Sequence, residues 1–305
     1  MGMLDGKVAI VTGAGNGIGR AHALELAKHG ATVVVNDLGG SVRGEGSGTS
    51  ADITVGLITE RGGRAVANYA DVGDHDQAGA LIAQAVDAFG RLDVLVNNAG
   101  IVRDAAIWNM AVDDWDLVLR VHLRGTWSCC HHAAVHWRGR AKGGESFHGR
   151  IINTTSGAGL TGNFGQTSYA TAKAAIVGLT QTLALELRSM GVTCNAVGPS
   201  GATRITASMP GRDTVIEPDQ VADGQWEPMN PANSSPLVAW LASDASSMVN
   251  GQVIRAVFDK IIWMHGWREG AVVASGNKPW DATKLDALLG ARLFHTGVEG
   301  LYFRP

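Results

Sequence analysis

The chain has 305 residues and a formal net charge of -3 at pH 7. It therefore has no excess of basic residues for binding nucleic acid or an anionic membrane surface. Hydrophobic residues make up 45% of the chain and charged residues 17%, which favours a large buried core over disorder. We expect one catalytic domain over residues 1–305 that binds a dinucleotide and acts on a small molecule.

Targeting and metal-binding signals are weak. No apolar run approaches the roughly 20 residues of a membrane span. The segment from Met1 to Gly6 lacks the basic start and hydrophobic stretch of a secretion signal. We therefore expect a cytoplasmic protein without a membrane span. Cys129, Cys130 and Cys194 show no metal-ligand spacing, so we interpret them as reduced structural thiols and expect no metal site.

Short β-branched runs alternate with longer segments of helical periodicity. Seven runs are predicted as strands: residues 7–12, 31–36, 64–69, 92–96, 150–155, 191–197 and 252–258. Most lack alternating polar residues, as expected for strands covered by helices on both faces. The pattern predicts an α/β fold, a single Rossmann-type doubly wound domain with a mostly parallel seven-stranded sheet.

A glycine-rich segment follows the first predicted strand and opens a helix. Glycines let backbone amides approach a pyrophosphate, and the helix dipole favours the negative charge there. The spacing is Gly-x-x-x-Gly-x-Gly rather than the usual Gly-x-Gly-x-x-Gly, so a tight strand-to-helix turn is the alternative. We predict that this segment binds the cofactor through Gly13, Asn16, Gly17, Ile18 and Gly19.

Polar residues follow the next three predicted strands. Asp37 lies where a carboxylate accepts hydrogen bonds from the adenosine ribose. It predicts NAD rather than NADP, because a 2'-phosphate would meet like charge; a turn residue before Gly39 is the alternative. Further cofactor contacts are predicted for Asp71, Val72, Asn98, Ala99 and Gly100, although these residues also suit loop formation.

Residues 199–236 mix Pro, Gly and acidic residues with large apolar side chains, as a substrate lid would. An ordinary long connection is the alternative. The segment holds two arginines, Arg204 and Arg212, against five acidic residues, a balance of 2 - 5 = -3. Residues 259–305 are predicted to form a C-terminal extension that packs on this subunit or on a neighbour.

A proton-transfer site is predicted from three side chains. Tyr169 and Lys173 lie four residues apart, so on a helix they share a face. An ammonium beside the phenol would lower the pKa of the tyrosine and make it a usable base. Ser156 lies thirteen residues before the tyrosine. An exposed helical pair and a strand-end hydroxyl are the structural alternatives.

With residues 12–19, 97–100, Ser156 and 169–173 in this order, the chain resembles the short-chain dehydrogenase/reductase family over roughly residues 4–260. The resemblance implies that Tyr169 is the acid/base, that Ser156 binds the substrate oxygen and that Lys173 holds the nicotinamide ribose. It also implies homodimers or homotetramers built on helices within residues 113–138 and 169–188.

Two positions depart from the common family pattern. His122 stands where many members have an asparagine that supports a water in a proton relay. A histidine there would relay protons or, alternatively, brace the helix as a buried neutral ring. Ser200 follows Pro199 at a position where many members have glycine. We still place Pro199 in the cofactor site, and we expect Thr203 or Thr206 to contact the carboxamide group of the nicotinamide.

Within the family, residues 35–40, 120–125 and 162–166 look like those of (3R)-hydroxyacyl-CoA dehydrogenases, some relatives of which oxidise steroid hydroxyls. The net charge of -3 in the predicted lid, residues 199–236, leaves few basic partners for the phosphates of coenzyme A. We therefore predict NAD-dependent interconversion of a secondary alcohol and a ketone on an apolar substrate, foremost a hydroxysteroid. The alternatives are a (3R)-hydroxyacyl-CoA dehydrogenase, a 3-oxoacyl carrier-protein reductase that prefers NADPH, and a nucleotide-binding regulator without catalysis.

Overall fold

The computed structural model describes residues 2–209, 211–222, 224–266, 272–274, 279–280, 282–285 and 289. The chain divides into a unit Met1–Met264 and a unit His265–Pro305. Most of the predicted C-terminal extension, residues 259–305, lies outside the described residues, as do residues 210 and 223 of the predicted lid.

The first unit contains one eight-stranded sheet in the order β3-β2-β1-β4-β5-β6-β7-β8. The strands are β1 (Val8–Thr12), β2 (Thr32–Asn36), β3 (Arg64–Asn68), β4 (Val94–Asn97), β5 (Arg150–Thr154), β6 (Thr193–Pro199), β7 (Val253–Val257) and β8 (Lys260–Met264). Strands β1 to β7 pair in parallel, and β8 pairs with β7 in the antiparallel direction. The predicted α/β Rossmann-type fold is confirmed, and each predicted strand lies within two residues of an observed one.

The eighth strand was missed by the sequence prediction. Val257 pairs with Lys260, so Phe258 and Asp259 form a two-residue hairpin turn. Phe258 has φ of 54°, a backbone conformation that non-glycine residues rarely adopt. Tight hairpins are usually recognised by Asn-Gly or Asp-Gly at this position, and Phe-Asp gives no such signal.

Helices cover both faces of the sheet, as the doubly wound pattern predicts. The α-helices are α1 (Gly17–Lys28), α2 (Ser50–Glu60), α3 (His75–Phe89), α4 (Val112–Leu119), α5 (Gly125–Lys142), α6 (Gly157–Thr161), α7 (Thr167–Glu186), α8 (Arg204–Ala207) and α9 (Ser235–Ala242). A π-helical turn (Arg120–Arg124) joins α4 to α5, and 3-10 turns span Ile107–Asn109, Arg188–Met190, Pro218–Gln220, Pro231–Ser234, Asp244–Ser246 and Ala282–Lys284.

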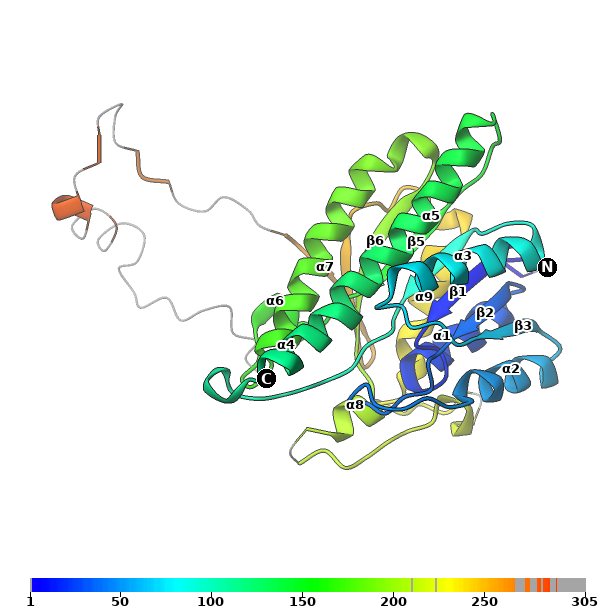
Figure 1. Cartoon of the computed structure of the whole chain (residues 1–305), viewed down its shortest axis with the longest axis horizontal. Helices are drawn as coiled ribbons and strands as arrows, with labels where there is room; N and C mark the ends of the chain where they lie inside the picture. The colour runs from blue at the N-terminus through cyan, green and yellow to red at the C-terminus, as the bar shows by residue number, and fades with distance from the viewer. Residues whose placement is uncertain are drawn as a thin grey trace. The chain divides into compact units, whose positions relative to one another are not determined.

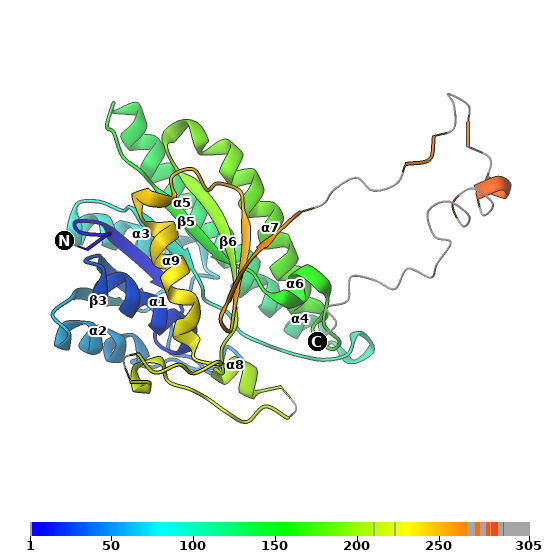
Figure 2. The ribbon, with the colours of Figure 1, turned by 180° about the vertical axis from the view of Figure 1, so that it is seen from behind.

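Two apolar layers separate these helices from the sheet. Ala9 and Val11 of β1 belong to a core with residues of α1, α2 and α9, whereas Val8 and Ile10 belong to a core with residues of α3, α5 and α7. The alternation follows the two-residue period of a strand. Figure 1 shows α3, α5 and α7 on one face, and Figure 2 shows α1 and α9 on the opposite face.

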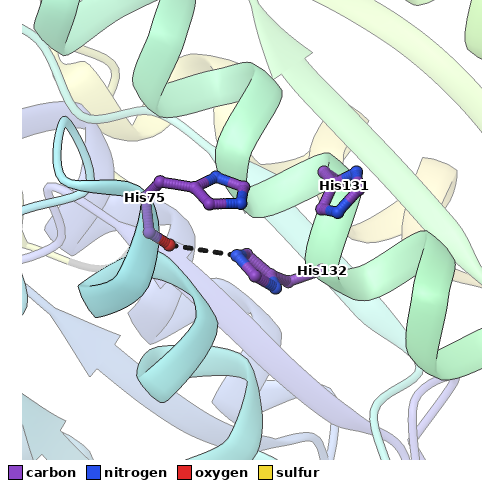
Figure 3. Close-up of side chains that lie close together, drawn as sticks. All are labelled: His75, His131 and His132. Carbon is purple, nitrogen blue, oxygen red and sulfur yellow. Dashed lines mark hydrogen bonds between the residues drawn. The ribbon is translucent and has the colours of Figure 1, made fainter.

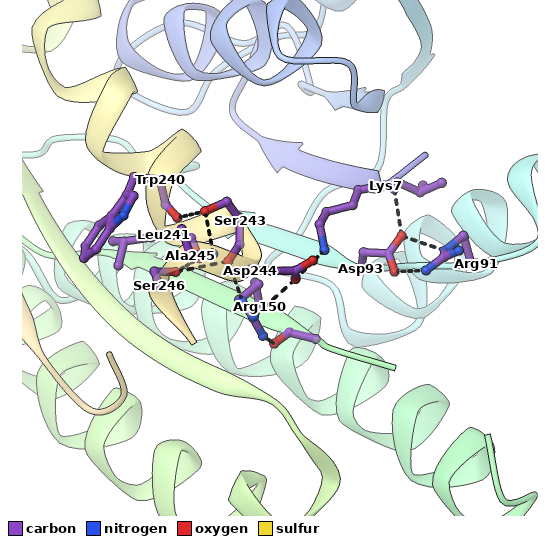
Figure 4. A network of polar contacts seen from close by, with 12 residues as sticks. Lys7, Arg91, Asp93, Arg150, Trp240, Leu241, Ser243, Asp244, Ala245 and Ser246 are labelled. Carbon is purple, nitrogen blue, oxygen red and sulfur yellow. Dashed lines mark hydrogen bonds and ion pairs between the residues drawn. The ribbon is translucent and has the colours of Figure 1, made fainter. Parts of the chain in front are cut away.

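A polar network ties together the amino ends of the central strands (Figure 4). Asp93 is buried and accepts the N–H of Val8 at 2.8 Å. The guanidinium of Arg150, 1% exposed, donates to two carbonyl oxygens and lies 3.5 Å from Asp244, which also pairs with Lys7 at 2.8 Å. These contacts occupy the amino ends of the central strands. The opposite side of the sheet, at the carboxyl ends of the strands, remains for a ligand.

Candidate active site

A cleft lies at the carboxyl ends of the parallel strands. Chain order reverses between β1 and β4, and ligands of doubly wound sheets bind at such a reversal. The structure brings all the residues predicted for catalysis or cofactor binding into the lining of this one cleft. They are Gly13, Asn16, Gly17, Ile18, Gly19, Asp37, Asp71, Val72, Asn98, Ala99, Gly100, His122, Ser156, Tyr169, Lys173, Pro199 and Thr203.

The glycine loop after β1 packs tightly on the end of β4. Gly13 has φ of 62°, and a side chain there would place its Cβ 2.7 Å from Cα of Ala99. A side chain at Gly19 would collide with the carbonyl oxygen of Gly13. The hydroxyl of Thr12 accepts the N–H of Asn98 at 3.0 Å, and the Asn98 amide donates to the Gly13 carbonyl at 3.1 Å. Glycine is therefore required at both positions for the loop to pack this closely on itself and on the end of β4.

Asp37 braces this loop from the end of β2. One carboxylate oxygen accepts the N–H of Gly15 at 2.8 Å, and the other accepts the N–H of Gly39 at 2.7 Å. Asp37 therefore has the turn-forming role that the sequence analysis gave as its alternative. A carboxylate accepts about four hydrogen bonds, so Asp37 retains acceptor capacity where it lines the cleft.

Asp71 serves mainly to order the loop after β3. Its carboxylate pairs with Arg120 at 2.8 Å and accepts the N–H of Gly73 at 2.8 Å. Arg120 comes from the π-helical turn, so the ion pair links that turn to the loop after β3 in the lining of the cleft. Val72 is buried beside it.

The three predicted catalytic residues are held by contacts between β5 and α7. Lys173 donates from Nζ to the carbonyl oxygen of Thr154 at 2.7 Å, and the Thr155 hydroxyl donates to the carbonyl oxygen of Lys173 at 2.8 Å. Ser156 caps α6 directly after β5. Tyr169 lies one helical turn before the lysine and hydrogen bonds with the Ser156 side chain.

The pKa of Tyr169 is raised, mainly because burial removes water from its hydroxyl. The hydrogen bond from Ser156 opposes this rise and the charge of Asp104 adds to it. The prediction that Lys173 lowers this pKa is wrong for this structure: Nζ lies 5.7 Å from the phenol ring centre and donates to Thr154. Burial also lowers the pKa of Lys173 to about 7. Tyr169 is therefore protonated at neutral pH, the form that donates a proton to a ketone.

His122 is a buried neutral ring, 1% exposed, in the π-helical turn. Its Nε2 lies 2.7 Å from the carbonyl oxygen of Ile101 and 3.1 Å from the N–H of the same residue. Nδ1 has no hydrogen-bond partner among the described residues, and the ring lies edge-on to Tyr169 at 5.1 Å. Burial, followed by the charge of Lys173, lowers the pKa of His122 to about 3. The structure thus favours bracing over proton relay by titration.

Some cleft residues were missed by the sequence prediction. Gln166 is 3% exposed, lines the cleft and donates to Asp104 at 2.8 Å. It belongs to residues 162–166, which supported the family resemblance and were the available signal. From the lid, three apolar side chains and one arginine also line the cleft: Ile205, Met209, Val215 and Arg204.

The lid is tied to the glycine loop through Arg20 of α1. This side chain is buried and pairs with Glu217 at 3.0 Å and with Asp219 at 3.2 Å. Its guanidinium also donates to the carbonyl oxygen of Gly15 at 2.6 Å. Two of the five acidic residues counted for the lid therefore share one compensating positive charge.

Comparison with known proteins identifies the family. The model of the short chain dehydrogenase family matches residues 7–211. The chain belongs to this family. Its structure superposes on that of a short chain dehydrogenase from Mycobacterium avium with a TM-score of 0.85 and 46% sequence identity, covering 96% of each chain.

Two curated relatives show similar identity. The chain is 42% identical over 279 residues to peroxisomal multifunctional enzyme type 2 of Mus musculus, covering 90% of this chain and 35% of that protein. It is 41% identical over 288 residues to hydroxyacyl-CoA dehydrogenase ChsB1 of Mycobacterium tuberculosis, covering 94% of this chain and 88% of that protein. The chain thus spans about a third of the length of the mouse relative and most of the mycobacterial one.

Membership of the family makes the chain an oxidoreductase that acts on CH–OH groups. The Rossmann fold of these enzymes typically binds a nicotinamide dinucleotide. The glycine loop fits such a group, because the cradle between β1 and β4 is closed to any added Cβ at Gly13 or Gly19. The three side chains predicted to be catalytic line the same cleft.

The cradle predicts the effect of a single methyl group. Gly19→Ala should raise the dissociation constant of NADH at least about ten-fold, or about 1.4 kcal/mol, because the new Cβ displaces the Gly13 carbonyl. Isothermal titration calorimetry measures this. Gly56→Ala in α2 is the control, since nothing lies within 4 Å of its Cβ and alanine favours a helix. A folded Gly19→Ala protein with the original affinity would contradict the assignment of the loop.

The protonation state of His122 predicts the pH profile of a variant. Because its pKa lies at about 3, the ring is neutral throughout the assay range and adds no titration there. His122→Asn should therefore lower kcat/KM by a similar factor at every pH between about 5 and 9, without moving the inflections. If the unsubstituted enzyme shows an inflection near about 6.5 that the variant lacks, His122 relays protons by titration.

Proposed function

We propose that the chain is an NAD-dependent (3R)-hydroxyacyl-CoA dehydrogenase, which interconverts a 3-hydroxyacyl and a 3-oxoacyl thioester. The observation that carries this proposal is the pairing of Glu217 and Asp219 with Arg20. The preference for a hydroxysteroid rested on the lid balance of -3, and the single positive charge of Arg20, shared by Glu217 and Asp219, offsets one of these negative charges. The names of the mouse and mycobacterial relatives also support the thioester over the steroid.

The lining of the cleft includes a cation of the kind that the phosphates of coenzyme A would need. Arg204 begins α8, is exposed and lines the cleft. Its guanidinium makes no ion pair with any other residue that the structure describes. Arginine suits phosphate because its planar fork donates two parallel hydrogen bonds. Beside it, Ile205, Met209 and Val215 offer apolar surface for an acyl chain.

The catalytic residues divide the chemistry between them. Bound NAD+ would accept the hydride from the carbinol carbon during oxidation. Tyr169 exchanges a proton with the substrate oxygen, and Ser156 donates a hydrogen bond to the same oxygen. The Ser156 oxygen accepts the N–H of Ala158 at 3.3 Å, and its hydroxyl hydrogen, which Tyr169 accepts in this structure, would turn to the substrate oxygen when substrate binds. Lys173 fixes α7 against β5 and would hold the nicotinamide ribose.

The choice of NAD over NADP is supported by charge at the end of β2. Asp37 lines the cleft, while the exposed Arg43 does not. Arg120, which does line the cleft, is paired with Asp71. A 2'-phosphate beside Asp37 would therefore meet negative charge without a free guanidinium nearby. NAD preference separates this proposal from a 3-oxoacyl carrier-protein reductase, which is expected to use NADPH.

Location and assembly stay predictions. In the part of the chain that the structure describes, no helix combines the length and hydropathy needed to cross a membrane. We retain the cytoplasm as the proposed location, and no nucleic-acid partner is proposed. Exposed apolar side chains on α5 and α7, namely Trp127, Val135 and Leu185, support a homodimer or homotetramer built on these helices.

The proposed phosphate contact is tested with two thioesters of one acyl chain. Arg204→Gln should lower kcat/KM about 10- to 100-fold for a 3-hydroxyacyl-CoA, equivalent to a lost charged hydrogen bond of about 1.5 to 3 kcal/mol. It should change kcat/KM less than about two-fold for the N-acetylcysteamine thioester, which has no phosphates. Formation of NADH at 340 nm is the readout.

Arg212→Gln is the matched control, since Arg212 lies in the same lid, is exposed and does not line the cleft. Equal losses on both thioesters would contradict a phosphate contact. Turnover of a 17β-hydroxysteroid without turnover of either thioester would overturn the proposed substrate. Absence of NADH formation with every alcohol tested would favour the non-catalytic regulator.

A further inference from the structure

Three histidines gather between α3 and α5, away from the catalytic cleft (Figure 3). His75 is the first residue of α3, and His131 and His132 are neighbours on α5. One ring nitrogen from each lies within 4.8 Å of the others. His131 is exposed and the other two are half-buried. None of the three lines the cleft, so the proposed reaction leaves the cluster unexplained.

Hydrogen bonds orient two of these rings in the manner of metal ligands. Nε2 of His132 lies 3.0 Å from the carbonyl oxygen of His75, so Nε2 carries the hydrogen and Nδ1 keeps a lone pair. Nδ1 of His75 lies 3.2 Å from the hydroxyl of the buried Ser128, and Nε2 has a lone pair for a metal in the tautomer in which Nδ1 donates to this hydroxyl. Metal-binding histidines usually make such a bond from the second ring nitrogen to a backbone carbonyl or another polar group.

The three rings also lie close to one another. The ring centres of His75 and His132 are 4.4 Å apart, and those of His131 and His132 are 5.2 Å apart. The neutral imidazole is the form that binds a metal ion.

We propose that His75, His131 and His132 form a binding site for a divalent transition-metal ion of the zinc type. Three imidazoles leave a fourth position for water, as in open tetrahedral sites. Zinc–nitrogen bonds of about 2.0–2.1 Å place ligand nitrogens roughly 3.3 Å apart, so the cluster must contract. His131 provides this adjustment because its side chain is exposed.

The site would join the start of α3 to the middle of α5. The turn before α3 contains Asp71 and Val72, which line the cofactor end of the cleft. An ion bound by both helices would therefore fix the turn before α3, although the ion itself would not lie in the cleft. The sequence prediction of no metal site was based on the spacing of cysteines. It did not include these histidines, because His75 and His132 are 57 positions apart.

Binding is tested on the tag-free full chain after dialysis against EDTA. Titration with Zn2+ by calorimetry should saturate at one ion per chain, and Co2+ should give a visible absorption band of tetrahedral coordination. His131→Ala should weaken both at least about ten-fold, a loss typical of damaged metal sites. Because His131 is exposed, this variant should keep its melting temperature in EDTA.

His29→Ala is the matched control, since His29 is a surface histidine paired with Glu25 on α1 and lies outside the cluster. It should bind Zn2+ within about two-fold of the unsubstituted chain. Zn2+ should also raise the melting temperature of the His29→Ala protein and leave that of the His131→Ala protein unchanged. No saturation at one equivalent, or equal affinity in the two variants, would overturn the proposal.

Discussion

A reciprocal pair of hydrogen bonds between β5 and α7 fixes the geometry on which the proposed chemistry depends. Lys173 donates from its side chain to the carbonyl of Thr154, while its own carbonyl accepts the hydroxyl of Thr155. The helix is thereby held against the end of the strand, where Ser156 begins α6. Tyr169, one turn earlier on the helix, meets the serine as a result. The catalytic groups are therefore placed by a secondary-structure junction rather than by a mobile loop.

Burial of this junction decides its electrostatics. Loss of water raises the pKa of Tyr169, lowers that of Lys173 to about 7 and lowers that of His122 to about 3. Each group is thus shifted toward its neutral form, as expected where charged forms lose solvation. A neutral phenol is suited to donating a proton to a ketone, and oxidation requires its deprotonation. The main structural role of Lys173 is to hold α7 against β5, because its side chain donates a hydrogen bond to the carbonyl oxygen of Thr154.

Local motifs predicted which residues share one cleft, because such motifs consist of adjacent residues. The glycine loop and the Tyr169–Lys173 pair were placed correctly in one cleft, since parallel strands must end at the same edge. Strand β8 escaped prediction because Phe258 adopts a positive φ without a glycine signal. The hydroxysteroid prediction used a charge count over the lid alone. That count did not include Arg20, which pairs with Glu217 although it lies 197 positions away in the sequence. Such long-range pairs leave no periodic trace in a sequence.

Replacement of the Tyr169 hydroxyl tests the central claim most directly. In Tyr169→Phe, the account predicts that kcat for a 3-hydroxyacyl-CoA falls by at least about 100-fold, the usual range for a lost general acid or base. The dissociation constant of NADH should change less than about two-fold, because the contacts that hold Lys173 and the glycine loop do not involve that hydroxyl. A variant that retains native turnover with native NADH affinity would contradict the account.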